Sequence, residues 1–269
     1  VSFNLEDKPS IIGSMVASSY KIGDVQYCIC IACQSSGELW RFDCSSINIS
    51  REPILRSVNV NPSQSELCQS FVKYCAGGKS LAWVHNEGVG KEGWKIAILL
   101  TASGFECWNV EIDSGRHVSL EWTFDLLADL EESKILVGQK QVWLLDFQVD
   151  VGKRRLKLLF ASHSMDKINN SSYMQYCIAN YSYDLNSAQR EGDIHVILPK
   201  ARIEEEEFLY SMRLRVGGKP EGSVMILASD GTATIAYDIG EMARLYQFNL
   251  AWDVGKVVDA CVLSFSEDN

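Results

Sequence analysis

The chain has 269 residues, of which 46% are hydrophobic, and its formal net charge is −10. A hydrophobic fraction of this size excludes a disordered chain and predicts a core large enough to fold without metals or disulfide bonds. The net negative charge disfavours a nucleic-acid-binding surface, because acidic groups repel the phosphate backbone.

From the N-terminus onward, apolar runs of about five to nine residues alternate with turns rich in Gly and Ser. The runs contain many Val, Ile, Tyr, Trp and Cys residues, a composition that favours β-strands. No segment has the caps and the helical periodicity of a helix longer than about two turns. The chain is therefore predicted to be all-β.

One unit recurs in chain order: an apolar strand, a tight Ser/Gly turn and a second, alternating strand. Its three clear copies are residues 31–40 with Gly37, residues 99–108 with Gly104, and residues 226–235 with Gly231. The glycines are 67 (104 − 37) and 127 (231 − 104) residues apart, so a degenerate copy with a longer loop is expected near residue 168. Each glycine is expected in a hairpin turn of a different sheet, because glycine readily adopts positive φ.

A second marker, an Asn or Asp flanked by apolar residues, is expected to close each unit. It occurs at residues 3–5, 58–60, 124–126, 183–185 and 248–250, and its polar residues are 55, 66, 59 and 65 residues apart. A repeat of about 60 residues matches a propeller blade of four strands with its loops. We therefore predict a β-propeller, with residues 1–269 as a single, partial propeller domain of about four blades from a longer chain.

Two tryptophans follow the hairpin glycines closely. Trp40 comes three residues after Gly37, and Trp108 comes four residues after Gly104. Because alternating apolar positions let each sheet pack on its neighbours, at least one of these rings is expected to be buried between two blades.

Motifs for phosphate binding are incomplete. Residues 76–80 (Ala-Gly-Gly-Lys-Ser) resemble the end of a phosphate-binding loop, but the position that requires glycine holds Lys73. Residues 217–220 are predicted to form a turn, because their proline prevents the helix that would bind a phosphate. No cofactor-binding residues are therefore expected.

The histidines and cysteines do not form a recognisable site. The four histidines, His85, His117, His163 and His195, are scattered singly. Ser162, His163 and Asp166 are close in sequence, but sequence neighbours do not make a catalytic triad. The nine cysteines are Cys28, Cys30, Cys33, Cys44, Cys68, Cys75, Cys107, Cys177 and Cys261, and none has a CxxC spacing. We expect reduced thiols, no metal and no catalytic residues.

Three segments have a second interpretation. Residues 153–155 and Lys157 form a basic group that is predicted to be a hairpin tip rather than a nucleic-acid site. The four glutamates at residues 204–207 are predicted to be a solvated loop or edge, with a docking edge for a basic partner as the alternative. Residues 62–78 are predicted to be loop or strand rather than a weak membrane-lying amphipathic helix.

The C-terminal third carries a specific resemblance. Residues 199–237 (PKARIEEEEFLYSMRLRVGGKPEGSVMILASDGTATIAY) and 244–264 (RLYQFNLAWDVGKVVDACVLS) closely resemble the N-terminal domain of the nucleoporin 133 family in its plant form. Residues 35–42 (SSGELWRF), 138–150 (GQKQVWLLDFQVD) and 171–176 (SSYMQY) fit the same family in the same order.

The resemblance implies a seven-bladed propeller, of which this chain holds about four to five blades. It implies a non-catalytic scaffold of the nuclear pore complex at the nuclear envelope, which supports mRNA export and protein import. The implied partners are other nucleoporins of the Y-shaped subcomplex, with the main contact in a helical region absent from this chain. A weak contact with the nuclear-envelope membrane is left open, and no direct contact with nucleic acid is expected.

The alternative is an adaptor-type propeller that binds a peptide or protein ligand outside the pore. A WD-type adaptor would show Gly-His and Trp-Asp pairs about every 40 to 45 residues. Here Gly-His is missing from the sequence, and Trp252-Asp253 is its only Trp-Asp pair. We therefore favour the scaffold.

Overall fold

The computed structural model of the chain describes the greater part of it, with gaps. The described residues are 12–22, 24–34, 39–45, 56–59, 80–84, 93–101, 103–111, 118–133, 139–150, 154–165, 172–201, 205–217, 222–237, 239 and 244–249. They form β-strands and two short helices.

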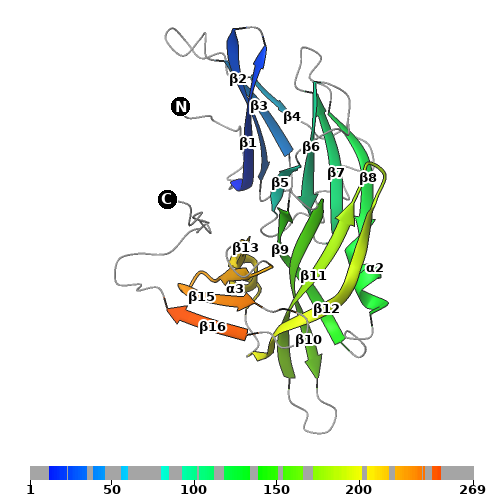
Figure 1. Cartoon of the computed structure of the whole chain (residues 1–269), viewed down its shortest axis with the longest axis vertical. Coiled ribbons are helices and arrows are strands. Elements are labelled where there is room, and N and C mark those ends of the chain that lie inside the picture. The colour runs from blue at the N-terminus through cyan, green and yellow to red at the C-terminus, as the bar shows by residue number, and fades with distance from the viewer. Residues whose placement is uncertain are drawn as a thin grey trace, which may run out of the picture. The chain divides into compact units, whose positions relative to one another are not determined.

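The described strands make four four-stranded sheets, in each of which strands adjacent in the chain are adjacent in the sheet (Figure 1). The first sheet contains β1 (Ile12–Ile22), β2 (Val25–Gln34), β3 (Leu39–Ser45) and β4 (Arg56–Asn59). The second contains β5 (Leu81–Val84), β6 (Trp94–Leu100), β7 (Gly104–Glu111) and β8 (Val118–Asp125). The third contains β9 (Gln139–Asp150), β10 (Arg155–Met165), β11 (Ser172–Tyr183) and β12 (Ala188–Ala201). The fourth contains β13 (Arg213–Val216), β14 (Val224–Leu227), β15 (Thr232–Tyr237) and β16 (Arg244–Asn249).

The chain divides into two compact units. Unit 1 comprises residues 1–102 and 108–120, and unit 2 comprises residues 103–107 and 121–269. Strands β7 and β8 each contribute residues to both units.

The core of unit 1 is built by apolar side chains from two sheets. Its buried members are Ile29, Ile31, Cys33, Leu81, Ala97, Leu99, Trp108 and Val110. Trp108 is only 4% exposed and lies in this cluster together with residues of β2, β5 and β6. The prediction of a tryptophan buried between blades is therefore confirmed for Trp108, whereas the Trp40 side chain lies outside the described residues.

The core of unit 2 joins the third and fourth sheets. Its buried members are Leu145, Leu159, Ala161, Met174, Tyr176, Ile178, Ile197, Leu209, Met212, Leu214, Val224, Ile226, Ala228 and Ala236. Alternate residues of β11 point to opposite faces of the third sheet. Tyr176 and Ile178 belong to this core, while Tyr181 lies on the other face and contacts Phe105. The third sheet is therefore buried on both faces at β11.

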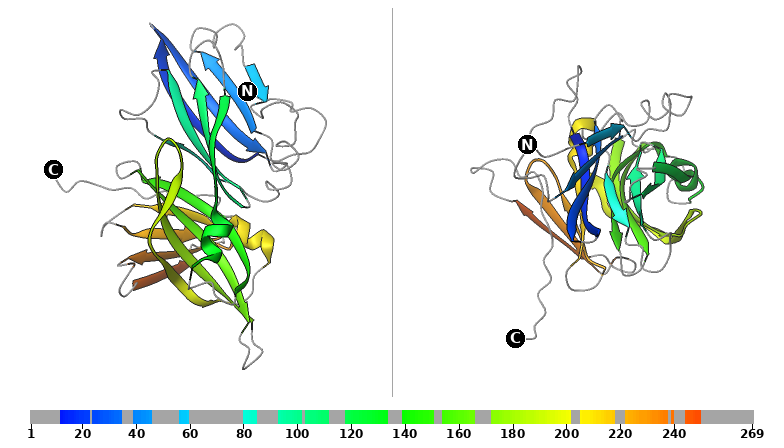
Figure 2. Two further views of the ribbon diagram at one scale, coloured as in Figure 1. Left: turned by 90° about the vertical axis from the view of Figure 1, so that its right-hand side faces the viewer. Right: turned by 90° about the horizontal axis from the view of Figure 1, so that it is seen from above.

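Both helices in the described part of the chain belong to unit 2 and are six residues long (Figure 2). α2 (Leu126–Glu131) begins after Asp125, whose Oδ1 accepts a hydrogen bond from the Ala128 N–H at 3.0 Å. This side-chain cap satisfies one of the free N–H groups of the first turn. α3 (Glu206–Ser211) begins after Glu205. Among the described residues, no helix is long and apolar enough to cross a bilayer.

The hairpin repeat falls at the same place in each sheet, between its second and third strands. Gly104 is the first residue of β7, and Gly231 lies between β14 and β15 with φ +82°. Gly37 lies outside the described residues, between β2 and β3. The degenerate copy corresponds to β10 and β11, which flank residues 166–171. The repeat therefore marks successive sheets.

The expectation of a positive φ is wrong for Gly104. The positive-φ glycines among the described residues are Gly93, Gly192, Gly217, Gly222 and Gly231. A Cβ added at Gly104 would instead lie 1.9 Å from the carbonyl oxygen of Phe124. Gly104 is needed because the backbone at the end of β8 approaches it closely.

The second marker, an Asn or Asp flanked by apolar residues, ends the last strand of the first, second and fourth sheets. It does not end the last strand of the third sheet. Asn59, Asp125 and Asn249 are the last residues of β4, β8 and β16. Asp184 instead lies in the turn between β11 and β12, where its Oδ1 accepts hydrogen bonds from the N–H groups of Asn186 and Ser187 at 2.7 and 2.9 Å. The prediction fails there because a short acidic side chain suits a tight turn as well as a strand end. The all-β propeller architecture itself is confirmed.

Candidate functional site

Arg154, Arg155 and Lys157 of the basic group lie at a hairpin, as predicted, and Lys153 lies outside the described residues. β9 ends at Asp150 and β10 begins at Arg155. Arg155 Nε lies 2.5 Å from Glu191 Oε2 of β12, and Lys157 Nζ donates to the Gly222 carbonyl at 3.3 Å. The Arg155 and Lys157 side chains thus bind other groups of the protein. This disfavours a nucleic-acid-binding surface here, because such a surface needs cations that can contact phosphates.

Ser162 and His163 do not form a catalytic pair. They are consecutive residues of β10, so their side chains point to opposite faces of the sheet. Ser162 is fully buried and its Oγ has no hydrogen-bond partner within the described residues, whereas His163 is half-buried. His195 lies in β12 opposite Ile178, and His85, His117 and Asp166 lie outside the described residues.

The acidic run coincides with the start of α3. Glu205 is the exposed N-cap residue and Glu206 is the first helical residue. Negative charge near a helix N-terminus interacts favourably with the helix dipole. This location is compatible with the predicted solvated edge and leaves the docking alternative open. Residues 62–78 lie outside the described residues.

The buried thiols are held in their protonated form. Burial raises the pKa of Cys107 and of Cys177 to about 12, and the nearby Ser162 hydroxyl partly opposes this at Cys177. Burial, with a contribution from nearby Cys28, raises the pKa of Cys30 to about 11. Thiols with such pKa values are poor nucleophiles and poor metal ligands at neutral pH, because the thiolate is the reactive species.

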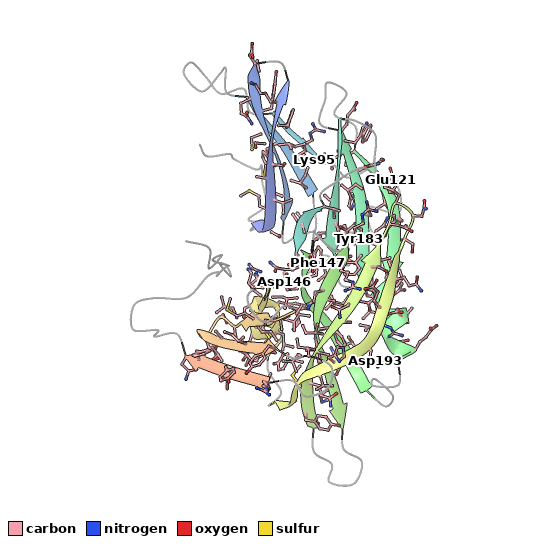
Figure 3. The ribbon with its side chains drawn as sticks, viewed as in Figure 1. Lys95, Glu121, Asp146, Phe147, Tyr183 and Asp193 are labelled. Carbon is pink, nitrogen blue, oxygen red and sulfur yellow. The ribbon has the colours of Figure 1, made fainter. Side chains whose placement is uncertain are left out.

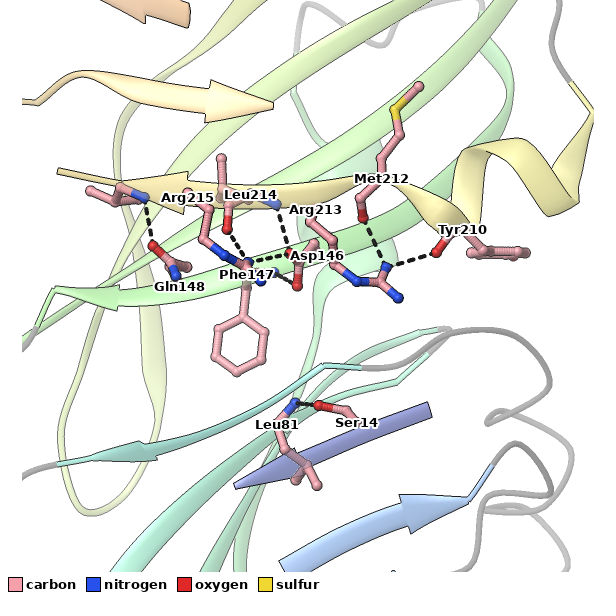
Figure 4. Close-up of polar contacts among 11 residues, drawn as sticks. Ser14, Leu81, Asp146, Phe147, Gln148, Tyr210, Met212, Arg213, Leu214 and Arg215 are labelled. Atoms are coloured by element: carbon pink, nitrogen blue, oxygen red, sulfur yellow. Dashed lines mark hydrogen bonds and ion pairs between the residues drawn. The ribbon is translucent and has the colours of Figure 1, made fainter. Parts of the chain in front are cut away.

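A buried polar network that was not predicted from the sequence joins the third and fourth sheets (Figure 4). The Asp146 side chain on β9 is 2% exposed, and its Oδ2 accepts a hydrogen bond from the Leu214 N–H at 2.6 Å. Arg215 Nη1 lies 3.4 Å from the same oxygen, and the Phe147 N–H donates to Oδ1 at 2.9 Å. The carboxylate is thus compensated by a cation and two backbone donors.

A second side chain of β9 repeats this arrangement. Gln148 Oε1 accepts a hydrogen bond from the Val216 N–H at 2.5 Å. Leu214 and Val216 are alternate residues of β13, the first strand of its sheet. The outward N–H groups of an edge strand need partners. Asp146 and Gln148 supply them and so connect two adjacent blades. The available sequence signal was a single acid inside an apolar run at residues 144–147.

An aromatic cluster in unit 2 lies beside the third sheet. The Phe105 ring contacts those of Phe147 and Tyr181 at centroid distances of 5.4 and 5.8 Å, and Phe124 contacts Tyr181 at 5.7 Å. All three contacts are edge-on, the arrangement that aromatic quadrupoles favour. The Tyr181 hydroxyl donates to Asp129 Oδ2 at 2.9 Å, and burial is the largest cause that raises its pKa.

The Asp146 and Phe147 contacts described above connect neighbouring sheets, and Figure 3 labels both residues among the described side chains. Within the described residues, no three His, Cys, Asp or Glu side chains come together as a group that could hold a metal ion. The Asp146 and Gln148 side chains accept hydrogen bonds from backbone N–H groups, and the Tyr181 hydroxyl donates to Asp129. Within the described residues, these contacts hold neighbouring strands and sheets together.

Comparison with known proteins agrees with this architecture. The family model described as Nup133 N terminal like matches residues 26–260. The nuclear pore complex protein NUP133 of Arabidopsis thaliana is 36% identical over 276 residues, an alignment that covers 98% of this chain and 20% of that protein. The chain therefore spans about one fifth of the length of this curated relative.

A solved structure shows the same fold. The β-propeller domain of Vanderwaltozyma polyspora Nup133 superposes with a TM-score of 0.53 at 15% sequence identity, over 85% of this chain and 65% of that one. At this identity the likeness concerns the fold alone. The family model, however, covers most of the sequence. The chain therefore belongs to the Nup133 N-terminal-like family of nucleoporins.

Proposed function

We propose that this chain is a non-catalytic structural part of the nuclear pore complex, located at the nuclear envelope. The observation that carries the proposal is the family match over residues 26–260. The Arabidopsis relative is named as a nuclear pore complex protein, which supports the same assembly for this chain. In that role the protein supports transport through the pore, including mRNA export and protein import.

The internal organisation of the chain supports a structural role as a scaffold. Adjacent sheets share apolar cores in both units, and in unit 2 the Asp146 network adds hydrogen bonds between two blades. The thiols of Cys107 and Cys177 are buried and protonated, so they do not supply a nucleophile. A propeller built in this way presents stable loops and edges for other proteins to bind.

Its partners in this proposal are other nucleoporins, specifically those of the Y-shaped subcomplex. Because the chain spans only a fifth of its curated relative, we expect the main contact to lie in a helical region outside this chain. We propose at most a weak membrane contact, and no direct contact with nucleic acid, because the chain is acidic. The adaptor-type alternative is not favoured, because the family match is to a nucleoporin domain.

Co-purification tests the proposal directly. The full-length protein is tagged, expressed at its native level, and isolated from cells under mild conditions, and bound proteins are identified by mass spectrometry. A structural nucleoporin should recover other nucleoporins in near-constant ratios. Recovery of ligase subunits or a peptide ligand without nucleoporins would support the adaptor instead.

A further inference from the structure

The first sheet holds two cysteines directly opposite each other on neighbouring strands. Cys28 lies on β2 and Cys44 on β3, and the antiparallel register of these strands pairs them as cross-strand partners. Directly opposite residues of an antiparallel pair have Cα atoms about 4.5 or 5.5 Å apart, depending on the type of pair. Both separations fall within the range of about 4.4–6.8 Å that a disulfide bond spans.

Cys28 is less buried than most of the described cysteines. Cys28 and Cys30 are only partly buried, whereas Cys33, Cys107 and Cys177 are buried. Burial lowers the pKa of Lys95, and the charge of nearby Cys28 acts in the opposite direction. A partly exposed thiol beside a cation is the setting typical of cysteines that react with oxidants.

We propose that Cys28 and Cys44 form a reversible disulfide bond across β2 and β3 when the protein meets a peroxide. The Cys28 thiol releases its proton, and the resulting thiolate attacks one peroxide oxygen. The O–O bond breaks, the leaving hydroxide takes up the released proton, and Cys28 sulfenic acid and one water are formed. The Cys44 thiol then attacks the Cys28 sulfur, the S–O bond breaks, and a second water leaves. Two thiols are oxidised and one hydrogen peroxide is reduced to two waters. This inference is independent of the proposed role in the pore.

The neighbouring cysteine provides a matched control. Cys30 lies on the same strand as Cys28 but opposite Phe42, so the register does not pair it with Cys44. Burial is the largest cause that raises its pKa to about 11, which keeps its thiol protonated. Cys30 is therefore expected to be dispensable for the bond.

The test is peptide mapping of the full-length protein under non-reducing conditions after treatment with hydrogen peroxide. We expect a linked peptide pair containing Cys28 and Cys44 that is lost on reduction with dithiothreitol. The pair should be absent in Cys44→Ser and retained in Cys30→Ser, with thermal unfolding used to establish that both variants fold. If wild-type Cys28 pairs with another cysteine, accumulates only as sulfinic or sulfonic acid, or stays reduced while the peroxide is consumed, the proposal is wrong.

Discussion

Asp146 shows how one side chain can join two sheets. It is buried on β9 and accepts hydrogen bonds from the Leu214 backbone and the Arg215 guanidinium, both on β13. Removing one partner of a buried, hydrogen-bonded ion pair leaves the other partner uncompensated. The energetic importance of this residue therefore comes from the groups that it satisfies rather than from attraction between charges alone.

We expect Asp146→Ala to lower the free energy of unfolding by about 3–5 kcal/mol, because Arg215 and the Leu214 N–H lose their acceptor. Asp146→Asn should cost less, since its amide oxygen can still accept from Leu214. Asp193→Ala, a change at an exposed position of β12, should stay within about 0.5 kcal/mol. Urea denaturation of the purified protein measures all three, and a near-neutral Asp146→Ala would refute the role of the network.

The buried thiols predict a dependence of stability on pH. The pKa values of Cys107 and Cys177 rise to about 12 in the folded protein, whereas an exposed thiol has a pKa of about 8.5. The two thiols of the folded state remain protonated at pH values where those of the unfolded state have already ionised. Their contribution to the free energy of unfolding is therefore fully present below about pH 8.5 and is lost as pH rises toward 12. We expect the double variant Cys107→Ala, Cys177→Ala to show a smaller loss of unfolding free energy between pH 8 and 10 than wild type. An equal loss in both proteins would contradict this assignment.

At the scale of elements, the boundary between strand and turn depends on short polar side chains and on glycine. Asp125 ends β8 and caps α2, while Asp184 closes the turn between β11 and β12. Gly231 supplies a positive φ in its hairpin, but Gly104 supplies space for the Phe124 carbonyl. The same residue type therefore performs different tasks at equivalent positions of the repeat.

The Gly104 contact leads to a specific expectation. A Cβ in Gly104→Ala would meet the carbonyl oxygen and carbon of Phe124 at 1.9 and 2.9 Å, so β7 or the end of β8 must shift. Gly222→Ala is the control: its φ is +90°, but nothing lies within 4 Å of the added Cβ. The strained φ of the control should cost about 1–2 kcal/mol, and Gly104→Ala should cost clearly more. Thermal unfolding of the two variants checks the order, and the reverse order would show that no close approach exists.

At the scale of the whole molecule, apolar packing between sheets is the dominant source of stability. Both cores combine residues from more than one sheet, so no blade buries its apolar face alone. Repeat architectures depend on such neighbour contacts. Loss of one inter-sheet side chain should consequently affect the domain and, through it, the proposed assembly into the pore.

We expect Trp108→Ala to lower the free energy of unfolding by about 3–5 kcal/mol, a large part of the roughly 5–15 kcal/mol that stabilises a domain. Nuclear-rim fluorescence of a full-length fusion should fall with thermal stability, because unfolded protein cannot assemble. Glu205→Ala, at an exposed position, and His163→Ala, at a half-buried one, should leave both measurements nearly unchanged. Loss of function in a fully folded His163→Ala protein would instead indicate a specific site and contradict the scaffold.

Much of the architecture was predictable from sequence, because strands and hairpins depend on local preferences. Alternating apolar residues specify which face of a strand is buried, and Gly231 marks a hairpin through its backbone freedom. The repeat of these signals was sufficient for the blades. It also predicted that at least one of Trp40 and Trp108 is buried between blades, which is confirmed for Trp108. The family resemblance at residues 199–237 added the nucleoporin assignment, which the family match confirmed.

Only the tertiary structure showed which distant groups meet. Asp146 and Leu214 are 68 residues apart, and no local pattern specifies that one accepts a hydrogen bond from the other. The close approach of Phe124 to Gly104 and the turn role of Asp184 likewise depend on strand register and on which residues follow. Sequence alone determined the strands, their repeat and the family. Long-range contacts were decided by the packing of sheets, because they depend on the positions of many residues at once.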